Sequence, residues 1–133
     1  MNVNELLIGL FAIAGGMTRY GVDQLLVVGH LPVATFTINL VGSFLLVFLT
    51  NTLAQIDGFP AQLILGLGTG FIGAFTTFSS YIFEIWQLYQ AQAYWLAAGY
   101  ALLSLVAGLL GAYLGLHASQ LDLKRLGKRE VSK

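Results

Sequence analysis

Long apolar runs, separated by short polar breaks, dominate the chain from its first residues to about position 117. A helix needs roughly 20 mostly apolar residues to cross a bilayer. The runs therefore predict an all-α membrane protein with four transmembrane helices in a single domain, residues 1–133. The predicted spans are residues 5–28, 33–53, 61–88 and 94–117. The first run is clean only to Met17, so its helix carries Arg19 and Asp23 into the interface or into a cleft lined by protein. Residues 118–133 form a soluble, basic tail.

The third run contains the segment GFIGAFTTFSSY, from Gly70 to Tyr81, which suits a membrane helix poorly. Gly73 and the following Ala-Phe-Thr-Thr predict a break in this helix at mid-membrane. Non-helical backbone is tolerated at that depth only when it is buried in protein or faces a cavity. Freed carbonyl groups suit an alkali or alkaline-earth cation, whereas freed N–H groups and a helix N-terminus favour an anion. The break therefore indicates a site that handles ions.

Neutral polar side chains also lie at depth in the last three predicted spans. They are Asn39, Ser43, Thr76, Thr77, Ser79, Ser80, Tyr100 and Ser104. Together they can line a polar route; alternatively, the hydroxyls bond back to their own helices and Asn39 joins two helices. Phe78 and Tyr81 are three residues apart, so they project on one side of a helix. Their positive ring edges can contact an anion, and the alternative is that both rings face lipid or core.

The composition narrows the class of protein. Hydrophobic residues make up 57% of the chain and charged residues 9%, with a mean hydropathy of +0.80. A soluble domain usually carries about a quarter charged residues. The formal net charge of zero argues against a nucleic-acid partner, and the lack of cysteine excludes disulfides and thiolate metal sites. The two histidines, His30 and His117, are expected at the membrane interface.

Charge placement separates the remaining function classes. Acidic residues fall near span ends or in loops, Glu5 and Glu84 among them. A proton-coupled transporter keeps an ionisable group inside the membrane, so active transport is disfavoured. One alternative is a small multidrug-type dimeric exporter, although that mechanism needs a membrane-embedded glutamate; another is a non-conducting structural membrane subunit. No nucleophile–base pair or metal-ligand set lies together in the sequence, so we expect no enzymatic activity.

Small residues recur four positions apart in the third and fourth runs, a spacing that lets helix backbones approach closely in lipid. The pairs are Gly66–Gly70, Ser104–Gly108 and Gly111–Gly115.

The segment GFIGAFTTFSSY, with Asn39 in TFTINLVGSF, Arg19 in GGMTRY and Glu84 in SYIFE, resembles the Fluc (CrcB) family of bacterial fluoride channels. The resemblance covers essentially the whole chain. It implies a passive, fluoride-specific channel in the cell membrane that exports fluoride and lowers its toxicity. It also implies an antiparallel dimer with two pores and a central structural sodium ion that is not transported.

By position, the resemblance assigns roles to individual residues. Gly73 and Thr76 would offer their backbone carbonyls to the sodium ion, two from each subunit. The implied pore residues are Asn39, Phe78, Tyr81, Tyr100 and Ser104, with Arg19 at the vestibule. Two departures leave open whether each pore conducts. Tyr81 stands where the family usually has a second phenylalanine, and Gly108 where the polar track would continue with serine.

The partner subunit depends on how the chain inserts. Four spans put both termini on one side, and lysine and arginine occur only at Arg19 and from Lys124 onward. Because the positive side is cytoplasmic, we expect both termini inside and a preferred orientation, which requires an inverted paralogue as partner. The alternative is a dual-topology homodimer in which the distal tail charges count little.

Overall fold

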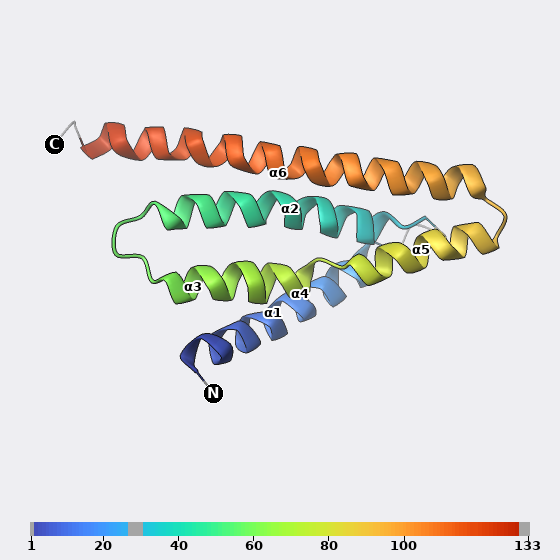
Figure 1. Cartoon of the computed structure of the whole chain (residues 1–133), viewed down its shortest axis with the longest axis horizontal. Helices are drawn as coiled ribbons and strands as arrows, with labels where there is room; N and C mark the ends of the chain where they lie inside the picture. The colour runs from blue at the N-terminus through green and yellow to red at the C-terminus, as the bar shows by residue number, and fades with distance from the viewer. Residues whose placement is uncertain (1, 27–30, 131–133) are drawn as a thin grey trace.

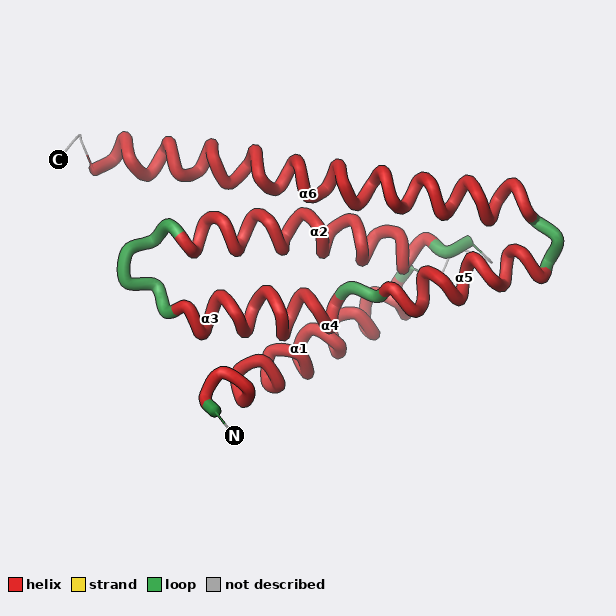
Figure 2. Tube along the Cα trace, in the orientation of Figure 1, coloured by secondary structure: helices red, strands yellow, loops and turns green. Residues whose placement is uncertain are grey.

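The computed structural model describes residues 2–26 and 31–130, and most of them lie in helices (Figure 1, Figure 2). The elements are α1 (Val3–Leu25), α2 (Val33–Ala54), α3 (Ala61–Leu65), the π-helical segment η1 (Gly66–Ile72), α4 (Gly73–Phe75), α5 (Phe78–Gln90) and α6 (Tyr94–Glu130). The α3, η1, α4 and α5 segments follow one another along a single pass, which we call the third pass. With α1, α2 and α6, the described chain makes four passes along the bundle. Its first and last described residues lie at the same end of the bundle (Figure 1).

Three of these passes are long and apolar enough to cross a membrane: Val33–Ala54, Ala61–Gln90 and Tyr94–Leu121. The chain is therefore a multi-pass membrane protein. The fourth predicted span, at the N-terminus, forms the 23-residue helix α1. This helix is less apolar than the other three passes because it carries Glu5, Arg19 and Asp23. A membrane-crossing α1 stays a prediction.

The ends of the predicted spans differ from the structure in two places. The first span was predicted over residues 5–28, but α1 ends at Leu25. The helix predicted to end at 117 continues to Glu130, so most of the predicted tail is helical. Lysine, arginine, glutamate and leucine are good helix formers, which lets the helix persist after the apolar run has ended. The predicted end of the first span at 28, the interfacial His30 and the last three residues of the tail lie outside the described residues.

Helix packing depends on glycines that admit a neighbouring backbone. A Cβ added at Gly111 of α6 would lie 2.8 Å from the Leu40 carbonyl oxygen of α2. A Cβ at Gly70 of η1 would lie 2.6 Å from the Ile8 carbonyl oxygen of α1, and one at Gly15 would overlap the Phe71 carbonyl. The small-residue spacing thus correctly predicted close packing. α2 packs along α6, while α1 crosses the first half of the third pass (Figure 1).

The interior of the single chain is small. Its buried apolar side chains are Ile38, Ile72, Phe75, Ala97 and Tyr100. Many large apolar side chains stay exposed on α1, α2, α5 and α6, which in a membrane chain marks surface for lipid or for another subunit.

Candidate functional site

The third pass is broken between α4 and α5, at Thr76 and Thr77. Both residues are extended, with φ, ψ of −75°, 157° and −146°, 118°. Gly73 itself is helical, so the break lies at the end of the Gly-Ala-Phe-Thr-Thr segment rather than at its glycine. The predicted break is confirmed. Thr77 then starts α5 by accepting a 3.2 Å hydrogen bond from the Ser80 N–H at its side-chain oxygen, the usual role of a threonine N-cap.

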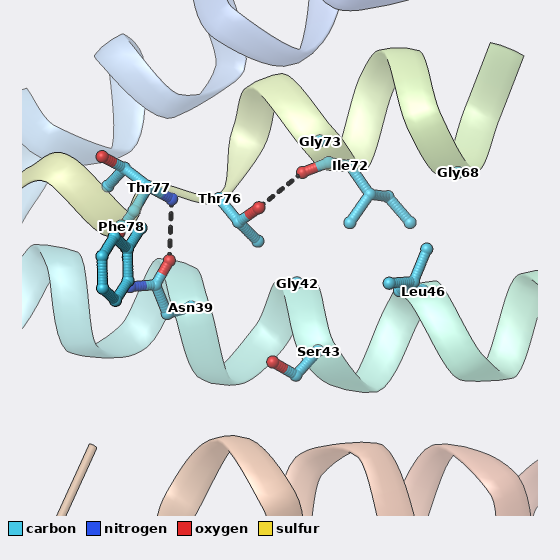
Figure 3. Close-up of a pocket in the computed structure, with 10 residues that line it drawn as sticks. All are labelled: Asn39, Gly42, Ser43, Leu46, Gly68, Ile72, Gly73, Thr76, Thr77 and Phe78. Carbon is cyan, nitrogen blue, oxygen red and sulfur yellow. Dashed lines mark hydrogen bonds between the residues drawn. The ribbon is translucent and has the colours of Figure 1, made fainter. Parts of the chain in front are cut away.

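Asn39 of α2 holds this break through a reciprocal pair of hydrogen bonds. The Thr77 N–H donates to Asn39 Oδ1 over 2.9 Å (Figure 3). In return, Asn39 Nδ2 donates to the Thr77 carbonyl over 2.9 Å. Thr77 is only 6% exposed, and a buried peptide group without partners is costly. The Asn39 amide therefore supplies hydrogen-bond partners to the Thr77 N–H and carbonyl at the point where the helix is broken.

The same hydrogen bonds leave two carbonyl groups without their helical donors. In an unbroken helix the Thr77 N–H would bond to the Gly73 carbonyl, and the Ser80 N–H to the Thr76 carbonyl. Here the first donates to Asn39 and the second to the Thr77 hydroxyl. The carbonyls of Gly73 and Thr76 are thus freed, as the sequence predicted for a broken helix. Their oxygens suit a hard cation.

These groups lie along a groove of about 290 Å³ between α2 and the third pass. Its lining residues are Asn39, Gly42, Ser43, Leu46, Gly68, Ile72, Gly73, Thr76, Thr77 and Phe78 (Figure 3). None of them carries a charge. Gly42 is essential to its shape, because a Cβ there would overlap the Thr76 side chain. Phe78 is 75% exposed at the start of α5, so its ring is open to a partner or an ion.

A second cluster lies beside the groove, between α5 and α6. The ring centroids of Phe78 and Tyr81 are 5.9 Å apart, and those of Tyr81 and Tyr100 are 5.5 Å apart. Phe78 and Tyr81 therefore do project on one side of α5, as predicted. The Tyr81 hydroxyl donates to the Ala101 carbonyl over 3.0 Å, so the hydroxyl that distinguishes it from phenylalanine ties α5 to α6.

Glu84 is the residue that the sequence reasoning missed. It was expected near a span end, without an assigned partner. In the structure its carboxylate accepts hydrogen bonds from both α2 and α6. Tyr100 of α6 donates to it over 2.7 Å and Thr35 of α2 over 2.6 Å. Tyr100 and Thr35 are both buried. The available signal was a lone acidic residue within reach of a predicted pore tyrosine, yet Thr35 is 49 residues away in sequence.

The remaining predicted site residues are placed as follows. Ser104 lies one turn after Tyr100 on α6, and its buried hydroxyl has no hydrogen-bond partner among residues 2–26 and 31–130. Arg19 lies on α1 and does not line the groove. The structure therefore brings the predicted pore and sodium residues together on α2, the broken pass and α6, but leaves Arg19 apart from them.

A family model described as CrcB-like protein, Camphor Resistance (CrcB), matches residues 6–116. The chain belongs to the CrcB family. A CrcB relative in Listeria monocytogenes, the fluoride-specific ion channel FluC 2, is 42% identical over 127 residues, which cover 96% of this chain and 98% of that protein. The fluoride-specific ion channel FluC 1 of Bacillus cereus is 40% identical over 116 residues, 83% of this chain and 82% of that protein. The one of Bacillus anthracis is 37% identical over 126 residues, 90% of each chain. The family resemblance found in the sequence is confirmed.

Proposed function

We propose that this CrcB chain is a subunit of a fluoride-specific channel that lets fluoride leave the cell passively. The observation that carries the proposal is the uncharged groove beside the broken third pass, in a chain whose relatives are named fluoride-specific ion channels. An ion channel is not an enzyme, and we propose no catalytic activity.

The chemistry of the groove suits a small anion. Conduction needs a site that binds the ion strongly enough to admit it and weakly enough to release it. The free N–H groups at the start of α5 and the exposed Phe78 ring offer positive partial charges without a fixed cation. Asn39, Thr76 and Ser43 add polar side chains along the same groove. No acidic residue lines it, which favours a channel over a proton-coupled exporter.

The test is fluoride efflux from proteoliposomes, followed with a fluoride electrode. Phe78→Ile should lower the efflux rate at least about tenfold, because isoleucine has no ring edge to offer the anion. The matched control is Phe83→Ile on the same helix, also an exposed phenylalanine, at 58%; it should leave efflux near the parent rate. Equal rates for both variants and the parent would contradict the role given to Phe78, and a parent that passes no fluoride, alone or with a paralogue, would contradict the function.

We further propose an antiparallel dimer. The groove is lined by residues of one face of a single chain, and the large Phe78 side chain lies exposed beside it; a second subunit would cover both. Reconstituting the chain alone tests whether the dimer contains one kind of subunit or two. Robust efflux then indicates a homodimer, whereas efflux only with an inverted paralogue indicates a heterodimer.

The dimer would hold a structural sodium ion on the freed carbonyls of Gly73 and Thr76, two from each subunit. Backbone carbonyl oxygens are hard ligands that suit this cation, and these two are the carbonyls whose usual helical donors bond elsewhere. Replacing sodium by N-methylglucamine should lower the flux or loosen the dimer. If both are indifferent to every cation, the assignment of this site is wrong.

We place the channel in the bacterial cell membrane with both termini in the cytoplasm. The two ends of the described chain lie at the same end of the bundle (Figure 1), and Lys124 on α6 is exposed. Because the sequence has no cysteine, Lys124→Cys gives a unique label. A thiol reagent that cannot cross the membrane should label it only in opened cells; labelling of intact cells would contradict this orientation. We also propose that Arg19 lies at the vestibule. This role is tested by replacing Arg19 and measuring fluoride efflux from proteoliposomes, as for Phe78.

A further inference from the structure

A hydroxyl on α2 lies opposite a missing side chain on α6. Tyr100, Ser104 and Gly108 follow one another at four-residue spacing, so they share one face of α6. The first two present hydroxyls, and the third presents nothing. The α6 side of the candidate pathway therefore loses its polar contacts one turn after Ser104.

Ser43 is the side chain that faces this gap. A Cβ added at Gly108 would lie 3.7 Å from Ser43 Oγ. Ser43 also lines the groove beside the broken pass, and its side chain points from α2 toward α6 (Figure 3). It thus lies between the hydroxyls of α6 and the groove that contains Asn39 and Phe78.

The Ser43 hydroxyl is free to serve a ligand. Two other hydroxyls on α2 bond back to their own helix, Thr37 to the Val33 carbonyl over 2.8 Å and Thr50 to the Leu46 carbonyl, and Thr35 donates to Glu84. No such bond forms from Ser43 within residues 2–26 and 31–130. A hydroxyl donates one hydrogen bond, and here that donor is not used by the helix.

We propose that Ser43 supplies, from α2, the hydroxyl donor that α6 lacks at Gly108. The inference rests on the proposed fluoride channel. A strongly hydrated anion needs a donor at each step to replace the water it leaves. Ser43 bridges the step between Ser104 and the groove, so it determines how fast this chain conducts.

The experiment measures fluoride efflux in whichever preparation of the parent conducts, the chain alone or with its paralogue. Ser43→Ala should lower the rate at least about tenfold, since one hydrogen bond to the anion is lost. Adding Gly108→Ser to it should restore the rate to within about threefold of the parent, because a Cβ at 108 stays at ordinary contact distance and returns a hydroxyl to the gap. Thr37→Val, which removes a hydroxyl from the same helix outside the groove, should conduct as the parent does.

Combining Ser43→Ala with Gly108→Ala separates a pathway donor from a packing residue, because the added methyl group lies in ordinary contact with position 43 and fills space without a hydroxyl, so it should not restore the rate. Ser43→Cys keeps the size of the side chain but only a weak donor, and it should lose flux as alanine does, so a misfolded alanine variant does not end the test. If the alanine and cysteine variants conduct at the parent rate, or Gly108→Ser fails to rescue, this inference is overturned while the proposed channel stands. A parent that never conducts refutes both.

Discussion

Replacing Asn39 by leucine tests the hydrogen-bonded clamp on the broken pass. Leucine keeps the branched shape of asparagine but has no polar atoms, so both 2.9 Å bonds to Thr77 are lost. The Thr77 N–H is then buried without an acceptor, which costs roughly 1–3 kcal/mol. The Thr77 carbonyl keeps its bond within α5 as the N-cap residue, so the second loss costs only about 0.5–1.5 kcal/mol.

The sum predicts that Asn39→Leu lowers the free energy of unfolding by about 1.5–4.5 kcal/mol. Unfolding in mixed micelles, driven by sodium dodecyl sulfate and followed by circular dichroism, measures this difference. The matched control is Thr37→Val on the same helix. Its hydroxyl bonds back to a carbonyl that retains a helical donor, so the change should stay under about 1 kcal/mol.

Hydrogen exchange gives an independent readout at a single atom. The Thr77 N–H should be protected in the parent and should exchange faster in Asn39→Leu, whereas amides in the middle of α2 should not change. If Asn39→Leu is as stable as Thr37→Val and the Thr77 N–H keeps its protection, Asn39 does not hold the break. The pathway at Thr76 and Thr77 would then need another support.

Three further substitutions test other contacts by the same unfolding assay. Tyr81→Phe removes only the bond to the Ala101 carbonyl; it should cost about 1 kcal/mol and leave fluoride efflux within about threefold, and a larger loss of efflux would assign its hydroxyl to the pathway. Glu84→Gln deprives one of two hydroxyls of its acceptor and should cost about 1–3 kcal/mol; an unchanged stability would contradict this network. Gly15→Ala forces a methyl group onto the Phe71 carbonyl and should cost about 1–3 kcal/mol or more, whereas a neutral effect would show that α1 can move aside.

The helices could be predicted from the sequence because a segment that crosses lipid must be apolar over about 20 residues. Apolar length alone located α2, the third pass and the start of α6, and the glycine and hydroxyl content of Gly73–Thr77 located the break. These features are local. A membrane helix is recognised from the apolar residues of its own run, and the break from the residue types within one short segment.

The partners of polar side chains were harder to predict, because they depend on how helices pack. Asn39 meets Thr77 across 38 residues and Thr35 meets Glu84 across 49. The spacing of residues within one helix does not indicate which residue of another helix they will contact. The sequence marked Asn39 as a pore residue from family resemblance, whereas its hydrogen bonds give it a clear structural task as well. Glu84 was predicted near a span end, and that position says nothing about the two hydroxyls that donate to it.

The two halves of the third pass have different neighbours, and this has a mechanical consequence. The first half, through α4, is packed on α1, whereas α5 is bound to α6 and, through Glu84, to α2. A displacement of α1 would therefore act directly on the third pass only as far as Phe75, and the two extended residues that follow, which Asn39 holds through Thr77, would take up the difference. When the two halves of the pass are displaced relative to each other, the first hydrogen bonds expected to break are those between Asn39 and Thr77.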